Sequence, residues 1–149
     1  MRLRPATAND AGALARIHAA CFPAPWGAAQ IGQLLGGPGS FGLLASAGRA
    51  ASGFILCRVI ADEAEVLTLA TVPRHRRRGL ARGLLAAGAE VARTGGATSL
   101  FLEVAEDNIP AVALYETERF VPVGRRARYY ARPGESPVDA LIMRRALNR

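Results

Sequence analysis

The chain has 149 residues, which is the length of one ordinary domain. Half of its residues are hydrophobic and 21% are charged, a balance that excludes an intrinsically disordered chain. Basic residues outnumber acidic residues by 19 to 12, giving a net charge of +7, and every basic residue is an arginine. Without lysine, the chain has no side-chain amine for Schiff-base chemistry or acylation.

The sequence indicates a cytoplasmic protein. Its first residues lack the apolar segment of a signal peptide. The long uncharged stretch from 19 to 48 contains three prolines and several glycines, which are incompatible with a membrane-spanning helix. Two cysteines are too few for a disulfide framework.

The first half of the chain is expected to form a short strand, two helices and three longer strands. Thr7 and Asp10 fit a helix capping box, and Leu14, Ile17 and Ala20 follow at helical spacing. The expected strands lie at 2–5, 41–46, 53–60 and 65–72, the expected helices at about 7–22 and 25–35, and a Gly- and Pro-rich loop at 36–39.

The second half is expected to alternate helices and strands. Gly79 begins a helix that ends at Gly95 and Gly96, and Asn108 can cap the next helix. The helix that begins at Gly79 is expected to bury one face, which carries Leu80, Leu84, Leu85, Gly88, Val91 and Ala92. The other expected elements are a strand at 99–104, a helix at 108–118, and strands at 120–131 and 138–147 around a turn at 133–135. This order, β-α-α-β-β-β-α-β-α-β-β, predicts a single mixed α/β domain over residues 1–149.

The loop before the helix at 79–94 is the clearest functional signal. Five arginines lie among residues 73–82. The unpaired N–H groups of a helix N-terminus bind anions, Gly79 allows close approach of the backbone, and arginine suits phosphate. A solvated basic turn and a nucleic-acid-binding surface remain alternatives, although no aromatic residues accompany the arginines. The loop lacks the ending of a P-loop.

Residues 76–81, Arg-Arg-Arg-Gly-Leu-Ala, resemble the pyrophosphate-binding loop of the GCN5-related N-acetyltransferase (GNAT) superfamily. That loop has Gln or Arg, then Gly three residues later, then Gly or Ala two residues after that. The resemblance extends over almost the whole chain and is strongest to the ribosomal protein N-terminal alanine acetyltransferases (RimI-type). The further matching segments are Phe22, Pro25-Trp26, 100–104, Asn108, 113–116, Phe120, 129–130 and 139–143.

The resemblance implies a single GNAT-type domain with a mixed, mostly antiparallel sheet of about seven strands. This sheet would be splayed in the middle and flanked by about four helices. The resemblance also implies acetyl-CoA as co-substrate and no metal. The pantetheine arm would pair with backbone groups in the splay, and the pyrophosphate would lie on the arginine loop. The matching cofactor-binding residues are Leu69, Ala70, Thr71, Arg76, Arg77, Arg78, Gly79, Leu80, Ala81, Arg82 and Asn108.

Acetyl transfer to an amine needs a base that deprotonates the ammonium and an acid that protonates the leaving thiolate. By the resemblance, Glu103 is the expected general base and Tyr115 the expected general acid. Taken alone, Glu103 would be a solvent-facing residue of a half-buried strand, and Tyr115 would be an aromatic residue packed on a helix face. A phenol with a pKa of about 10 is a weaker acid than a thiol of about 8.5, so Tyr115 can contribute a hydrogen bond instead of full proton transfer.

The resemblance places the acceptor between the early loop and the C-terminal hairpin. This makes Trp26, Tyr129 and Tyr130 the candidate substrate-binding residues. Glu106 and Asp107 are further candidates for attracting the ammonium of the acceptor.

One position departs from the pattern of the family, which usually has glycine where this chain has Arg119. If that residue is left-handed, an arginine is strained there. His18 and His75 are expected to be non-catalytic, and Cys21 and Cys57 to be small buried hydrophobic residues.

The sequence therefore predicts an acetyl-CoA-dependent N-acetyltransferase, a cytoplasmic acyltransferase that modifies the N-terminal α-amine of a protein by direct attack. The expected acceptor is a small-subunit ribosomal protein. We expect no membrane partner, no requirement for nucleic acid, and a monomer or weak dimer. Three alternatives stay open: a GNAT-fold acetyltransferase for a small-molecule amine, a basic nucleic-acid-binding module, and a CoA-binding protein that no longer catalyses.

Overall fold

The structure is a computed structural model that describes residues 1–76 and 79–147. Its strands are β1 (Arg2–Pro5), β2 (Ser40–Ala47), β3 (Ala50–Ile60), β4 (Glu63–Thr71), β5 (Ser99–Ala105), β6 (Val121–Arg132) and β7 (Glu135–Ala146). Its helices are α1 (Ala11–Cys21), α2 (Ala28–Leu35), α3 (Leu80–Thr94) and α4 (Ile109–Thr117), with 3-10 turns at Ala8–Asp10 and Pro73–His75. The predicted order of elements is confirmed. In the described residues, no helix has both the length and the hydropathy that crossing a membrane requires.

The strands form one sheet in the order β1-β2-β3-β4-β5-β7-β6. Neighbouring strands are antiparallel except for β4 and β5. A parallel pair needs a crossover connection, and α3 supplies it. The expected mixed, mostly antiparallel sheet of seven strands with four flanking helices is therefore confirmed.

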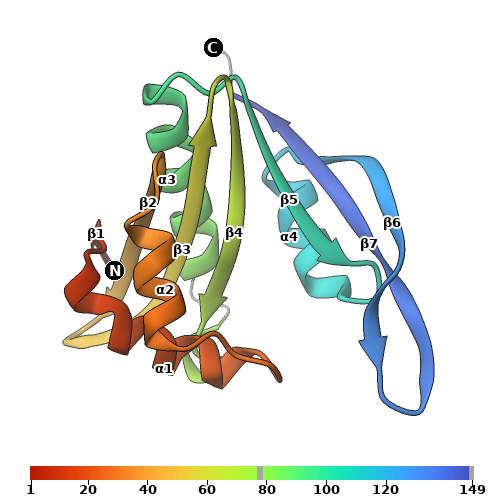
Figure 1. Cartoon of the computed structure of the whole chain (residues 1–149), viewed down its shortest axis with the longest axis horizontal. Coiled ribbons are helices and arrows are strands. Elements are labelled where there is room, and N and C mark those ends of the chain that lie inside the picture. Colours follow the sequence, from red (N-terminus) through yellow and green to blue (C-terminus); the bar gives the residue numbers. More distant parts are fainter. Residues whose placement is uncertain (77–78, 148–149) are drawn as a thin grey trace.

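The parallel pair β4–β5 joins the two halves of the sheet by a very short ladder. Three residue pairs make up this ladder, from Glu63 opposite Ser99 to Glu65 opposite Phe101. Both strands continue beyond it and separate into the V that Figure 1 shows. The expected splay is confirmed. It leaves one edge of β4 without a strand partner, and the backbone groups along such an edge can pair with an extended ligand.

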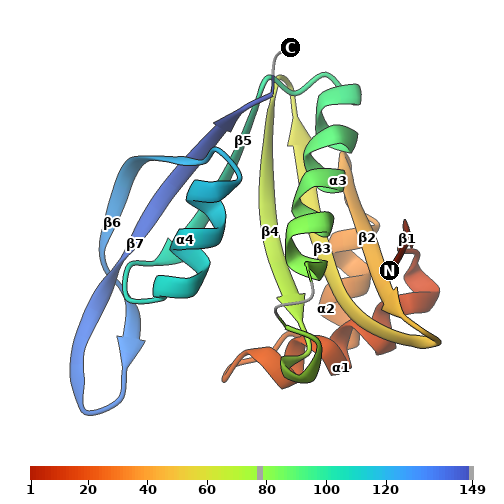
Figure 2. The same ribbon diagram turned by 180° about the vertical axis from the view of Figure 1, so that it is seen from behind.

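Helices cover both faces of the sheet. α1 and α2 pack on one face of β2, β3 and β4, where Leu14, Ile17, Ile31 and Phe54 belong to one buried cluster. α3 covers the opposite face of the same strands, and α4 lies on the same side as α3 but against the β5–β7 half (Figure 2). The splay therefore opens between α3 and α4 on one side of the sheet.

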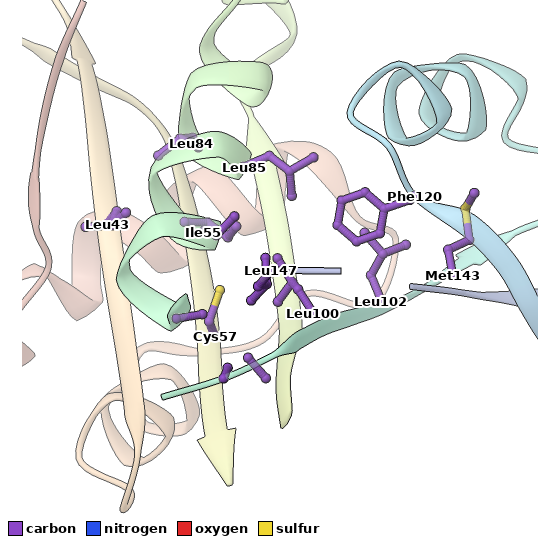
Figure 3. Packing of buried hydrophobic residues seen from close by; sticks show 14 of the residues in the cluster. Leu43, Ile55, Cys57, Leu84, Leu85, Leu100, Leu102, Phe120, Met143 and Leu147 are labelled. Carbon is purple, nitrogen blue, oxygen red and sulfur yellow. The ribbon is translucent and has the colours of Figure 1, made fainter. Parts of the chain in front are cut away.

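The core beneath α3 and α4 joins the two halves of the sheet. Leu85 of α3 points toward Phe120 in Figure 3, where Leu102 and Met143 lie on the other side of that ring, and all four side chains are buried. Truncating a buried phenylalanine to alanine typically costs about 3–5 kcal/mol, so Phe120 is a major contact across the splay.

Two residues that the sequence pattern assigned to buried helix faces are exposed. Ala20 faces solvent and Val91 is 40% exposed, whereas His18 and Ala89 are buried. The face of α1 and of α3 that packs on the sheet is therefore rotated slightly from the face that the spacing of large apolar residues predicts. The second helix also begins later than expected, at Ala28.

Arg119 has a left-handed backbone, with φ 71°. Its N–H donates to the carbonyl of Glu116 at 3.1 Å, and the N–H of Phe120 donates to the carbonyl of Tyr115 at 2.9 Å. These two bonds close the end of α4 in a Schellman motif, which normally uses glycine at the left-handed position. An arginine there carries backbone strain of about 1 kcal/mol.

Replacing Arg119 by glycine is expected to raise the melting temperature by about 2–4 °C, because it removes about 1 kcal/mol of strain. Arg119→Ala removes the same side chain but keeps a Cβ on a left-handed backbone, so it should give no such rise. Thermal unfolding followed by circular dichroism compares the two variants. Equal increases in both would place the effect in the side chain and contradict the backbone explanation.

Candidate active site

The splayed end of β4 leads into a loop whose backbone is suited to an anion. The 3-10 turn at Pro73–His75 is followed by Gly79, which is left-handed with φ 78°. A Cβ at Gly79 would meet no atom within 4 Å, so the backbone conformation, and not crowding, calls for glycine. The first N–H groups of α3 have no partner within the helix and remain available to a ligand. The predicted ligands Arg77 and Arg78 lie outside the described residues.

The other predicted donor-binding residues come from β4, α3 and the start of α4. The side chains of Leu80 and Ala70 are buried in the core, so these residues can offer a ligand only their backbone. Arg82 reaches from α3 to α4, where its Nε lies 2.8 Å from Oε2 of Glu118. Asn108 caps α4, and its side-chain oxygen accepts a hydrogen bond from the N–H three residues later at 3.4 Å.

Thr71, at the end of β4, has more internal contacts than the sequence suggested. Its carbonyl oxygen accepts hydrogen bonds from Nε of Arg76 at 3.0 Å and from Sγ of Cys21 at 3.2 Å. Its hydroxyl oxygen is buried and has no partner among the described residues. Leu69 and Ala81, the remaining predicted donor contacts, are half-buried. The carbonyl of Thr71 is therefore already used within the protein, and its hydroxyl is enclosed by neighbouring atoms. Cys21 is half-buried, so the prediction of a buried residue was wrong there.

A groove of about 410 Å³ runs between the start of α3 and the end of α4. Its walls carry Arg82, Arg119 and Arg145 against the single carboxylate of Glu118. Positive charge beside the N-terminus of a helix suits a ligand that carries several phosphates.

Glu103 lies on β5 just beyond the ladder with β4. Its neighbours Leu102 and Val104 point into the core under α3 and α4, so Glu103 points to the opposite face of the sheet. Its carboxylate accepts a hydrogen bond from Nε of Arg126 in an ion pair, and its side chain is 28% exposed. The pair borders a pocket of about 260 Å³ whose apolar wall includes Phe101. The glutamate that the sequence places in an apolar strand is therefore an accessible, ion-paired carboxylate.

Tyr115 comes from α4 on the other side of the sheet. Its ring packs edge-to-face on Phe120, with ring centroids 5.8 Å apart. Burial, with a smaller contribution from Tyr130, raises the pKa of Tyr115 to about 12. Burial and the charge of Glu103 raise the pKa of Tyr130 in turn. Tyr130 therefore lies within electrostatic reach of both predicted catalytic residues, and Tyr115 stays protonated at physiological pH.

Arginines of β6 pair with the acidic residues that the sequence offered as attractors of an ammonium. Arg125 pairs with Glu106 at 2.5 Å and Arg132 pairs with Asp107 at 2.7 Å, next to the ion pair of Glu103. Sequence reasoning missed these arginines. No local signal could have revealed them, because the partners stand 19 to 25 residues apart in the chain.

The predicted acceptor-binding aromatic residues come from two segments at the open end of the V. The loop between α1 and α2 and the tip of the β6–β7 hairpin both lie at this end (Figure 1). Trp26 stacks on buried His18 with ring centroids 4.8 Å apart, and its backbone N–H donates to Nδ1 of His18 at 3.0 Å. Tyr129 is 55% exposed and packs edge-on against half-buried Tyr130.

Acetyltransferases of the GNAT type have this fold, in which two parallel strands pair briefly and then separate beside the start of a helix that can bind an anion. Residues 12–119 match the model of the acetyltransferase (GNAT) family. This match covers more than half of the chain, and the chain therefore belongs to that family.

Named relatives agree with this assignment. The chain is 35% identical over 145 residues to the N-alpha-acetyltransferase RimI of Mycobacterium tuberculosis, covering 93% of this chain and 88% of the relative. It is 37% identical over 92 residues to the ribosomal protein bS18-alanine N-acetyltransferase of Salmonella typhimurium, covering 62% of each chain. The match covers only 21% of the length of another relative. The crystal structure of the ribosomal-protein-S18-alanine N-acetyltransferase from Escherichia coli superposes with a TM-score of 0.89 at 25% identity, covering 99% of this chain and 96% of that one.

Acidification is expected to loosen the loop of Trp26 through His18. Burial lowers the pKa of His18, so the stability it contributes is present above about pH 6.5, the value for an exposed histidine, and is lost as the pH falls below it. Trp26 is the single tryptophan of the chain, so its fluorescence should stay constant above about pH 6.5 and change as the pH falls below that value. His18→Asn keeps an acceptor near Nδ1 but does not titrate, and it should abolish the change. The same response in that variant would show that another group is responsible.

Proposed function

We propose that this chain is an acetyl-CoA-dependent N-acetyltransferase that modifies the N-terminal α-amine of a protein. One observation carries the proposal: β4 and β5 part between an anion-binding loop and the carboxylate of Glu103. A phosphorylated acyl donor and an amine can approach each other through this opening from opposite faces of the sheet. Membership of the acetyltransferase family supports the reaction, and the names of the relatives support a protein acceptor.

The donor site suits a pantetheine arm followed by a pyrophosphate. The edge of β4 beyond the ladder offers backbone groups of residues 69–71 to the arm, apart from the carbonyl of Thr71, which already accepts two hydrogen bonds. The start of α3 at Gly79 receives the pyrophosphate. Arg82 supplies positive charge from a fixed position, because Glu118 already holds its guanidinium.

Glu103 acts as the general base. An α-amine with a pKa of about 8 is mostly protonated at neutral pH, and only the neutral form is a nucleophile. The carboxylate takes the proton directly or through a water molecule, which leaves a neutral amine beside the thioester. Roughly a tenth of the amine is already neutral at pH 7, so a carboxylate is a sufficient base.

The neutral amine attacks the carbonyl carbon of the thioester and forms a tetrahedral intermediate. A backbone N–H of β4 within 69–71 stabilises its negative oxygen. The C–S bond then breaks, its electron pair leaves with the sulfur, and Tyr115 donates a proton to the thiolate. The phenol recovers a proton from the nitrogen as the amide forms. Since the pKa of Tyr115 is about 12 and that of a thiol about 8.5, donation has to be concerted with this recovery.

The surroundings of the opening favour a protein acceptor. The loop of Trp26 and the exposed ring of Tyr129 provide aromatic surfaces for an extended chain, and Tyr130 packs against Tyr129. A net charge of +7 repels a small cationic amine at long range but suits an acceptor carried by an anionic particle such as a ribosome. The relatives named for ribosomal protein bS18 support a ribosomal protein as the acceptor.

Calorimetric titration with acetyl-CoA tests the donor site. We expect one-to-one binding in the micromolar range that weakens as salt screens the anionic tail. Gly79→Ala should weaken binding about tenfold, because alanine strains the left-handed turn that presents the start of α3. Gly48→Ala is the matched control, since Gly48 is also left-handed with open space for a Cβ but lies in a distant turn. No binding by the folded protein would overturn the proposed function.

Kinetics with peptides that carry free N-termini test the catalytic residues. Glu103→Gln should lower kcat about 100-fold at neutral pH and leave the affinity for acetyl-CoA unchanged. The deficit should shrink above about pH 8, where the amine no longer needs a base. Tyr115→Phe should lower kcat far more than it lowers the affinity for acetyl-CoA. Glu90→Gln changes an exposed carboxylate of α3 that pairs with Arg93, and it should leave both quantities unchanged.

Three results would contradict parts of this assignment. An unchanged kcat in Glu103→Gln would remove Glu103 from the mechanism. Equal losses of kcat and acetyl-CoA affinity in Tyr115→Phe would make Tyr115 a donor contact. Faster acetylation of a panel of small amines than of any peptide would replace the protein acceptor with a small molecule.

A further inference from the structure

Arg126 of β6 occupies the carboxylate that the proposed reaction requires. Its Nε donates a hydrogen bond to Oε1 of Glu103. A guanidinium does not lose its proton in proteins, so the ion pair persists whenever no other cation competes for Glu103. Arg126 also lies over the ring of Tyr129, 5.7 Å from its centroid.

The α-ammonium of an acceptor would form the same kind of hydrogen-bonded ion pair with Glu103 that Arg126 forms. Each is a cation that donates N–H groups to a carboxylate oxygen. The neighbouring carboxylate of Glu106 offers no substitute, because Arg125 already holds it at 2.5 Å. An incoming ammonium that binds this oxygen of Glu103 therefore competes with Arg126 for it.

The backbone next to Arg126 is anchored independently of its side chain. Residues 127–129 of β6 bulge opposite a single residue of β7, Asp139. Within the bulge, Arg128 is left-handed with φ 52°, and its backbone N–H donates to Asp139 at 2.9 Å. The side chain of Arg126 is 56% exposed, and in the described part of the chain Glu103 is its one ion-pair partner. The guanidinium can therefore move without disturbing the strand.

The pocket beside the ion pair can accept a displaced guanidinium. Besides the pair itself, the charged groups that line it are Arg58 of β3 and Glu63 and Glu65 of β4. Of the tyrosines of β6, Tyr129 lies near Arg126 and Tyr130 lies within electrostatic reach of Glu103. Glu65 pairs with Arg58 at 2.8 Å, whereas Glu63 has no ion-pair partner among the described residues. A displaced Arg126 can turn toward these carboxylates and keep its charge compensated.

We propose that Arg126 is a positioning residue that holds the carboxylate of Glu103 in the free enzyme and is displaced by the α-ammonium of the acceptor. This inference rests on the proposed function. While the pair lasts, the carboxylate is held at the opening. The exchange of one cation for another is easy, because exposed ion pairs contribute little in water. Arg126 therefore competes with the protonated form of the acceptor and not with its neutral form.

Steady-state kinetics of Arg126→Gln with a peptide that begins with alanine test the displacement. At about pH 7 we expect the peptide KM to fall by up to about fivefold, with kcat within about twofold of the wild type. At about pH 9.5 an α-amine with a pKa of about 8 is neutral, and the two KM values should converge. Arg126→Lys keeps a cation that can pair with Glu103 and should restore wild-type behaviour.

Arg93→Gln is the control. Arg93 is likewise an exposed arginine in an ion pair with a glutamate, but it lies on α3 and pairs with Glu90, which the proposed reaction does not use. Its peptide KM should match the wild type at both pH values. Calorimetry with the same peptide and with its Nα-acetylated form gives a second readout, in which Arg126→Gln should tighten binding of the free amine alone.

Two outcomes would overturn the displacement. A peptide KM that rises or stays unchanged in Arg126→Gln would mean that Arg126 binds the acceptor or does not compete with it. A KM ratio that is independent of pH would mean that the residue acts through structure alone. Both outcomes require an active wild type. They therefore differ from the result that would contradict the proposed function, in which the wild type binds no acetyl-CoA and acetylates no peptide.

Discussion

The short ladder between β4 and β5 is the constraint on which the rest of the site depends. A parallel pair needs a crossover, and α3 makes it by running back from the end of β4 to the start of β5. Because the strands part after three residue pairs, the start of α3 and the later residues of β5 border one opening. The splay forgoes backbone hydrogen bonds that an extended substrate can restore. The core around Phe120 compensates by holding the two halves of the sheet together.

The net charge of +7 is not spread evenly over the protein. On the acceptor side, arginines of β6 pair with Glu103, Glu106 and Asp107, so that region is close to neutral. Unbalanced positive charge gathers instead in the groove between α3 and α4. Under the proposed function, this distribution directs a phosphorylated donor and a protonated amine to opposite sides of the sheet, where each meets charge that suits it.

The end of α4 links backbone strain to the reaction. The left-handed turn at Arg119 lets the N–H of Phe120 bond to the carbonyl of Tyr115, and the two rings pack edge-to-face. The proposed acid is therefore fixed by the same turn that strains Arg119. Its burial raises the pKa of the phenol, which keeps it a hydrogen-bond donor and makes it a reluctant proton donor.

Much of the fold and part of the site could be predicted from the sequence by itself. Hydrophobic periodicity and Gly, Pro and Asn signals are local, so the order of elements, the start of α3 at Gly79 and the cap at Asn108 followed from residues a few positions apart. The resemblance then pointed to Glu103 and Tyr115 as the candidates for catalysis. Only the tertiary structure decided what these residues touch. The pairing of Glu103 with Arg126 and the contact of Cys21 with the carbonyl of Thr71 depend on strand register, a bulge in β6 and contacts between distant segments, none of which leaves a pattern in neighbouring residues.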